Sequence, residues 1–85
     1  MPQVTIYTKP YCPFCIRAVG LLKEKGAEFT EIEASSDPNK RQEMIQRSGR
    51  MTYPQIFIGE KHIGGCDDIM ALERAGGLDP LLAAG

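Results

Sequence analysis

The first half of the chain switches from a strand pattern to a helical pattern. β-branched and apolar residues fill positions 4–8 and stop at a Lys-Pro pair, which predicts a strand because proline cannot donate a ladder hydrogen bond. Pro13 suits the first position of a helix, and Gly26 suits its end. Between these two residues the apolar side chains recur at helical spacing: Cys15, Ala18, Val19 and Leu22.

The middle of the chain predicts a second strand and a second helix. Residues 29–33 alternate apolar and acidic positions, as a strand with one polar face does. A strand, helix, strand unit of this length favours two parallel neighbouring strands joined by a right-handed crossover. Asp37 and Pro38 then open a helix that ends at Gly49, and its thin apolar stripe predicts that it covers an edge of the sheet.

The last part of the chain predicts a hairpin and a third helix. A strand over 55–58 leads through a Gly-Glu turn into a short strand that ends at Ile63. A helix follows from Cys66 through Leu72, with two aspartates in its first turn where the helix dipole favours them. The order βαβαββα predicts an α/β sheet with helices on its faces. The 85 residues, 1–85, are expected to form a single domain.

Composition and charge exclude several classes of function. Ten Lys and Arg residues face eleven Asp and Glu residues, so the net charge is −1. This balance lacks the basic surface that nucleic-acid phosphates or acidic membranes require, and we expect neither partner. No apolar run is long enough for a membrane span, and the first residues do not resemble a secretory signal. We therefore expect a cytoplasmic location.

The chain contains three cysteines, and two of them form a Cys-x-x-Cys pair. Cys12, Pro13, Phe14 and Cys15 lie where the first strand passes into the first helix. A Cys-x-x-Cys beside a strand, helix, strand unit indicates a thioredoxin-like redox pair. Cys12 falls at the helix N-cap, where free N–H groups and the helix dipole favour a thiolate. Cys15 lies one turn further on the packed side, within reach of a disulfide with Cys12.

The helix dipole alone does not activate such a thiol. A free thiol is about 3% ionised at neutral pH, and a dipole contribution of roughly 1 kcal/mol raises this to about 14%. Direct N–H hydrogen bonds or a nearby positive charge must add to it. Lys9, just before the motif, is the nearest candidate for that charge.

Two other interpretations of the cysteines remain open at this point. A structural disulfide is disfavoured by the odd number of cysteines and the absence of a secretory signal. A zinc site would combine Cys12 and Cys15 with His62 and Cys66. It is disfavoured because Cys15 and His62 are too far apart in sequence for the usual finger or ribbon, and because Pro13 separates the first two ligands.

Three motifs together resemble the glutaredoxin family over nearly the whole chain. The Cys-Pro-Phe-Cys pair is similar to the Cys-Pro-Tyr-Cys of the dithiol class, closest to the small bacterial members. Thr52-Tyr53-Pro54 and the Gly-Gly-Cys-Asp-Asp segment at 64–68 follow at that family's spacing. The resemblance implies an α/β protein with the minimal thioredoxin (glutaredoxin) fold, a four-stranded mixed sheet with three flanking helices.

The resemblance also implies a glutathione site. Lys9 and Arg41 would face the glycine carboxylate, although Arg41 also fits a solvated helix position. Pro54 would be cis, so that the backbone of Tyr53 pairs with the ligand like an added strand. The N–H groups of Cys66 and Asp67 would donate to the γ-glutamyl carboxylate, and the Asp67 carboxylate would pair with the ammonium group. The implied binding residues are Lys9, Phe14, Arg41, Thr52, Tyr53, Pro54, Gly65, Cys66 and Asp67.

Several of these positions have other interpretations. One of Asp67 and Asp68 is expected to be a simple helix cap. Phe14 replaces the family's usual tyrosine and keeps an aromatic wall beside the thiols. Tyr53 replaces the usual valine, and a large ring at the rim would alter which protein substrates dock. The Cys66 thiol is expected to be a small packed group rather than a catalyst.

The resemblance implies a glutathione-dependent thiol–disulfide oxidoreductase. Cys12 attacks glutathionylated proteins or protein disulfides, and Cys15 resolves the latter. By the same resemblance, we expect glutathione to be a co-substrate that glutathione reductase regenerates indirectly, no cofactor or metal to be tightly bound, and the protein to be a monomer. Two alternatives stay open: a thioredoxin-like electron donor, for instance to ribonucleotide reductase, and a carrier of a [2Fe–2S] cluster held by Cys12 of two subunits and two glutathiones. A pure interaction module would leave an exposed thiol pair unexplained.

Overall fold

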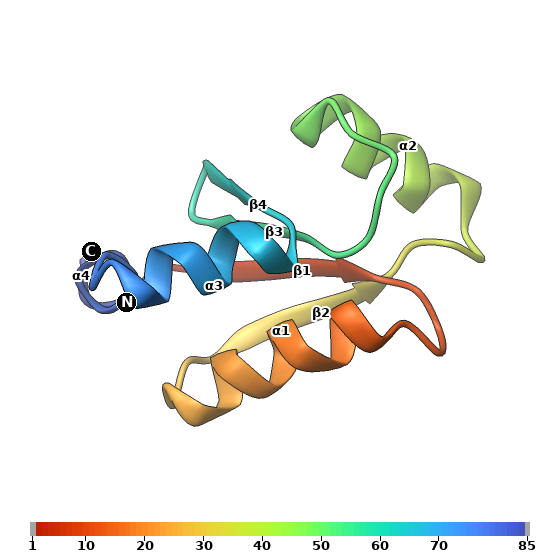
Figure 1. The fold of residues 1–85 in the computed structure, drawn as a ribbon. Helices are drawn as coiled ribbons and strands as arrows, with labels where there is room; N and C mark the ends of the chain where they lie inside the picture. Colours follow the sequence, from red (N-terminus) through yellow and green to blue (C-terminus); the bar gives the residue numbers. More distant parts are fainter. Residues whose placement is uncertain (1, 85) are drawn as a thin grey trace.

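The computed structural model describes residues 2–84 and contains the predicted strands and helices in the predicted order (Figure 1). The elements are β1 (Val4–Thr8), α1 (Pro13–Glu24), β2 (Phe29–Glu33), α2 (Pro38–Ser48), β3 (Gln55–Ile58), β4 (Lys61–Gly64), α3 (Cys66–Arg74) and α4 (Leu78–Ala83). The helix ends follow their capping residues. The Asp37 carboxylate accepts hydrogen bonds from the first N–H groups of α2, and Gly49 closes that helix in the left-handed conformation with φ of +72°.

The four strands form one mixed sheet in the order β2-β1-β3-β4. β1 runs parallel to β2, as the strand, helix, strand pattern predicts, and antiparallel to β3. The turn after Ile58 sends the chain back as β4, antiparallel to β3. Every residue of β1 and β3 is buried, whereas β2, at one edge of the sheet, has only half-buried and exposed residues. The apolar character of each strand therefore follows its place in the sheet.

The two faces of the sheet carry separate apolar clusters. On one face, α1, α3 and α4 pack against alternate residues of the central strands, a cluster that contains Val4, Ile6, Ala18, Leu21, Leu22, Ile56, Ile58, Ile69, Leu78 and Leu82. On the other face, Met44 of α2 packs against Tyr7 and Phe57. The prediction that α2 covers an edge was wrong, because Tyr7 and Phe57 belong to the two central strands.

A polar network explains how α2 covers the sheet with so few apolar residues. The hydroxyl group of Tyr7 donates to the Glu43 carboxylate and accepts a hydrogen bond of 2.8 Å from the Arg47 guanidinium. The same guanidinium lies 4.1 Å from the ring centroid of Phe57. Cation–π contact and charge-assisted hydrogen bonds thus replace part of the hydrophobic contact that the sequence pattern of α2 lacks.

The short helix α4 is an addition to the three predicted helices. It follows the Gly76-Gly77 pair, and a proline lies in its first turn, where the missing N–H breaks no helical hydrogen bond. Leu78 and Leu82, one turn apart, are both buried in the larger core cluster. Among residues 2–84, no helix has the length and apolarity that crossing a bilayer requires.

Candidate active site

Cys12 is the N-cap residue of α1, as predicted. Its backbone is extended, with φ of −104° and ψ of 106°, and Pro13 occupies the first helical turn. The Cys12 Sγ accepts a hydrogen bond from the backbone N–H of Cys15, with the two atoms 3.2 Å apart. The thiol pair was expected to be exposed, but it is buried: only 4% of the surface of Cys12 and 3% of that of Cys15 is accessible to solvent. The Cys12 side chain turns back onto the helix N-terminus to accept this bond, which places the sulfur at the positive end of the helix.

Cys15 lies on the packed side of α1, one turn after Cys12. Burial raises the pKa of its thiol to about 12, and the hydrogen bond and negative charge of Cys12 add to the rise. Cys15 therefore keeps its proton at neutral pH. Burial also raises the pKa of the Cys66 thiol, at the start of α3. The environments of the three thiols favour an asymmetric pair with a third, protonated thiol nearby.

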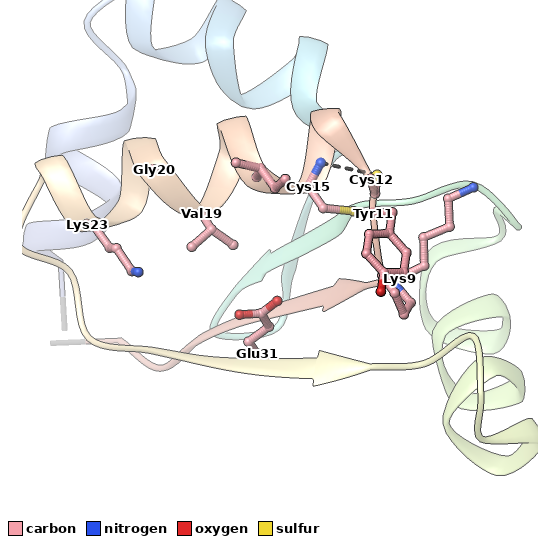
Figure 2. A pocket seen from close by; sticks show the side chains of 10 residues that line it. Lys9, Tyr11, Cys12, Cys15, Val19, Gly20, Lys23 and Glu31 are labelled. Carbon is pink, nitrogen blue, oxygen red and sulfur yellow. Dashed lines mark hydrogen bonds between the residues drawn. The ribbon is translucent and has the colours of Figure 1, made fainter.

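A cavity of about 440 Å³ runs along α1 beside the thiol pair, and we call it the thiol cavity (Figure 2). Its lining includes both active-site cysteines and, further along, Val19 and Gly20 of α1. Figure 2 shows Lys9 and Lys23 toward opposite ends of this cavity, with Glu31 of β2 between them. The two buried cysteines thus border a hollow on the β2 side of the helix.

A second hollow of about 210 Å³ lies between the loop before β3 and the start of α3, and we call it the loop–α3 groove. The Tyr53–Pro54 peptide bond within it is cis, as the resemblance implies. Its lining residues come from the start of α1, that loop and the first turn of α3: Phe14, Arg50, Thr52, Tyr53, Pro54, Gly65, Cys66, Asp67 and Asp68. The fold therefore brings together every residue implied for glutathione binding except Lys9 and Arg41.

The first turn of α3 separates the roles of the two aspartates. The Asp68 carboxylate accepts the N–H of Gly65 at 2.8 Å and an N–H of Arg50 at 3.0 Å. These two contacts, the Gly65 bond first, lower the pKa of Asp68. Gly64, with φ of +117°, must be a glycine, because a Cβ there would run into the same carboxylate. Asp68 is therefore the expected cap, and the Asp67 carboxylate is left at the groove.

The two remaining implied residues lie in different places. Lys9 lines the thiol cavity, and its Nζ lies 5.8 Å from the ring centroid of Tyr53, which lines the groove. Arg41 is an exposed residue of α2 whose guanidinium lies 4.0 Å from the Met51 sulfur, and it lines neither hollow. Lys9 is thus next to both hollows, whereas Arg41 would have to reach a ligand that extends beyond the groove.

Sequence reasoning missed one ion pair at the groove. Arg50 lines the groove and pairs with Asp68. Two features of the sequence could have indicated this pair: the position of Arg50 shortly before the Thr-Tyr-Pro segment, and the position of Asp68 in the first turn of a helix. Tyr53, which was expected at the rim, lines the groove and also packs against the cluster that contains Met44. Its hydroxyl oxygen is buried and has no hydrogen-bond partner among residues 2–84.

His62, the residue that the zinc hypothesis added, is part of another contact. Its Nε2 lies 2.7 Å from the side-chain oxygen of Gln55, and its ring packs on Phe57 with the centroids 5.0 Å apart. In the described part of the chain, no three side chains of His, Cys, Asp or Glu gather as a metal site would require.

Known proteins are similar to this chain in sequence and in fold. The family model named Glutaredoxin matches residues 4–63, which is most of the chain. The chain belongs to the glutaredoxin family. Glutaredoxin 3 of Escherichia coli K12 is 58% identical over 82 residues, which cover 96% of this chain and 99% of that protein. Glutaredoxins are thiol–disulfide oxidoreductases, and this chain is one by its family, its fold and its thiol pair.

Solved glutaredoxin structures have the same mixed sheet with flanking helices. The solution structure of a Brucella melitensis glutaredoxin has a TM-score of 0.85 at 62% identity and covers 96% of this chain and 89% of its own. A crystal structure of a buckwheat glutaredoxin–glutathione complex has a TM-score of 0.84 at 36% identity, covering 93% of this chain and 74% of its own. The predicted thioredoxin-type fold is therefore confirmed.

Proposed function

We propose that this glutaredoxin uses glutathione to reduce protein–glutathione mixed disulfides and protein disulfides. The observation that carries the proposal is the loop–α3 groove, which gathers a cis-proline loop, the N–H groups of a helix start and an acidic side chain beside the thiol pair. The solved structure of a buckwheat relative with glutathione supports the same ligand. Glutathione is then a co-substrate, with no tightly bound cofactor.

The chemistry of the groove matches the γ-glutamyl end of glutathione. The N–H groups of Cys66 and Asp67, at the start of α3, donate to the carboxylate, where the helix dipole adds attraction. The Asp67 carboxylate pairs with the neighbouring ammonium group. The backbone of Tyr53, before the cis bond, pairs with the tripeptide like an added strand. Lys9 and Arg41 supply positive charge for the glycine carboxylate at the other end.

Reduction of a mixed disulfide then needs Cys12 alone. The Cys12 thiolate attacks the glutathione sulfur of a glutathionylated protein, which forms a Cys12–glutathione disulfide and releases the protein thiolate, which takes a proton from water. A second glutathione, as its thiolate, attacks the glutathione sulfur of that intermediate. Glutathione disulfide leaves and the Cys12 thiolate is restored, held by the N–H of Cys15.

Reduction of a protein disulfide also uses Cys15. Attack by Cys12 forms a protein–Cys12 mixed disulfide and releases one protein thiolate. Cys12 no longer carries a charge in this intermediate, which removes a part of what raises the pKa of Cys15. Cys15 then loses its proton to water and attacks the Cys12 sulfur, which leaves a Cys12–Cys15 disulfide and releases the second protein thiolate, which takes a proton from water. Two glutathiones reduce that disulfide and become glutathione disulfide.

A coupled assay tests the proposal. The protein is supplied with a glutathione mixed disulfide, glutathione, NADPH and glutathione reductase, and NADPH consumption is followed. Turnover that depends on glutathione supports the proposal. Turnover that occurs only when thioredoxin reductase replaces the glutathione system supports a thioredoxin-like donor instead. We propose further that the protein acts as a monomer in the cytoplasm, on glutathionylated and disulfide-containing proteins, with glutathione reductase as its indirect partner.

A further inference from the structure

Behind the Thr52–Pro54 wall of the groove lies a buried carboxamide. The side chain of Gln55, the first residue of β3, is fully inaccessible to solvent. Its Nε2 donates to the backbone oxygen of Thr52 at 3.0 Å and to the Thr52 hydroxyl at 3.1 Å. Its Oε1 lies 2.7 Å from the Nε2 of His62 on β4. A polar side chain held so completely inside the sheet is rarely without a role, because each lost partner leaves a buried polar atom unpaired.

The partners determine which atom donates at each end. The backbone oxygen of Thr52 can only accept, so the NH2 group of Gln55 must face Thr52 and its carbonyl oxygen must face His62. His62 Nε2 therefore carries a hydrogen and donates it to Gln55. His62, Gln55 and Thr52 form a chain of hydrogen bonds that runs one way, from β4 to the groove wall.

We infer that Gln55 and His62 are positioning residues that hold the Thr52–Tyr53 backbone in the conformation that receives the disulfide substrate. The inference rests on the proposed function, since the segment they hold is the wall of the groove assigned to glutathione. Neither residue lines the groove, so neither touches the ligand. They act on the ligand through Thr52, because Gln55 holds the backbone oxygen of Thr52, and the next residue, Tyr53, is the one whose backbone is proposed to pair with glutathione.

The surroundings of His62 suit a neutral donor. Burial, and secondly the Arg50 guanidinium, lower the pKa of His62, while the Asp68 carboxylate acts in the opposite direction. The ring also stacks on Phe57, so its plane and the direction of its Nε2–H are set by packing as well as by hydrogen bonding. A phenylalanine at this position would keep the stacking and remove the donor, whereas a glutamine would keep a donor at nearly the same place.

The test compares three variants in the coupled assay, with the mixed disulfide of glutathione and 2-mercaptoethanol as substrate. His62→Phe should raise KM for this substrate about three- to tenfold, the range expected for one ordinary hydrogen bond, with kcat unchanged. His62→Gln should restore the KM of the unmodified protein. Lys25→Met is the matched control, because it breaks the ion pairs with Glu73 and Asp79, away from the groove, and should lower stability without changing KM.

The outcomes separate this inference from the proposed function. If the unmodified protein does not turn over the mixed disulfide, the proposed function is wrong. If it does, and His62→Phe has an unchanged KM or His62→Gln fails to restore it, the positioning role is wrong. Should His62→Phe not fold, the side-chain amide of Gln55 is followed by NMR in the unmodified protein. Its resonances should shift when S-methylglutathione is added, and unchanged resonances at saturation would overturn the inference.

Discussion

The backbone N–H of Cys15 donates a hydrogen bond to the Sγ of Cys12 over 3.2 Å. This contact has opposite effects on the ionisation of the two thiols. The amide stabilises negative charge on Cys12, and the charge on Cys12 in turn helps to keep the proton on Cys15. One short turn of helix therefore gives the two thiols different environments, which the proposed mechanism requires of an attacking thiol and a resolving thiol.

Alkylation should reveal this asymmetry. With iodoacetamide at pH 7, Cys12 should react faster than a free cysteine, because its thiolate is stabilised by the helix N-terminus. Cys15, whose pKa is raised to about 12, and Cys66, whose pKa is raised by burial, should remain unlabelled. Mass spectrometry of the digested protein measures the three sites separately. Equal labelling of Cys12 and Cys15 at pH 7 would contradict the asymmetry.

The hydroxyl group of Tyr7 should contribute to stability. It is fully buried and joins Glu43 and Arg47 of α2 to the sheet. Tyr7→Phe keeps the ring and removes both hydrogen bonds, so the free energy of unfolding should fall by about 1–2 kcal/mol. Urea denaturation followed by circular dichroism measures the change. A variant as stable as the unmodified protein would show that α2 does not depend on this network.

Replacing Tyr53 with phenylalanine should increase stability, whereas the same substitution at Tyr7 should decrease it. The Tyr53 hydroxyl oxygen is buried without a hydrogen-bond partner among residues 2–84. On folding, this hydroxyl group therefore loses its hydrogen bonds to water and gains none within the protein. Tyr53→Phe should raise the free energy of unfolding by about 1 kcal/mol. The same urea measurement applies, with Tyr7→Phe as the matched comparison. A loss of stability at Tyr53 would mean that this hydroxyl group is satisfied in solution.

Asp68 should make stability depend on pH in acid. Its pKa is lowered in the folded state from the ordinary value of 3.8, first by the Gly65 N–H and then by Arg50. Its contribution is therefore fully present above about pH 4 and is lost as the pH falls through the lowered folded value. The carboxylate is half exposed and screened by solvent, so Asp68→Asn should cost at most about 1 kcal/mol at pH 7.

The pH series supplies the control for that substitution. The difference in unfolding free energy between Asp68→Asn and the unmodified protein should shrink towards zero below the folded pKa of Asp68. Asp67→Asn removes the same charge from the same helical turn without removing the cap. A stability difference at Asp68 that stays constant from pH 7 down to strong acid would contradict the ionic origin of the effect.

Local signals were enough to predict the strands, the first three helices and the thiol pair. Pro13 fixed the start of α1, and that start alone places Cys12 at the N-cap. The short helix α4 was missed because two glycines and a proline in this segment are typical of a loop. Its two leucines are seen to be buried only in the folded structure, where they pack into the larger core cluster. Local propensity cannot reveal burial that depends on distant elements.

The parts of the site that escaped prediction all depend on tertiary contacts. Arg50 and Asp68 are far apart in the chain and meet only when the loop before β3 lies against α3. The ring of Tyr53 was expected at the rim, and only the folded structure shows that it also packs against the cluster around Met44. His62 was considered as a zinc ligand, whereas the hairpin register carries it to Gln55.

Trapping the first covalent intermediate tests the role of Cys12 most directly. The Cys15→Ser variant is treated with glutathione disulfide, and its digest is examined by mass spectrometry. A single glutathione should be found in disulfide linkage to Cys12, because the resolving thiol is gone and the released glutathione thiolate is the only other product. The Cys12→Ser variant should acquire none. Glutathione attached to Cys66 instead, or equal labelling of both variants, would contradict the assignment of Cys12 as the nucleophile that exchanges with glutathione.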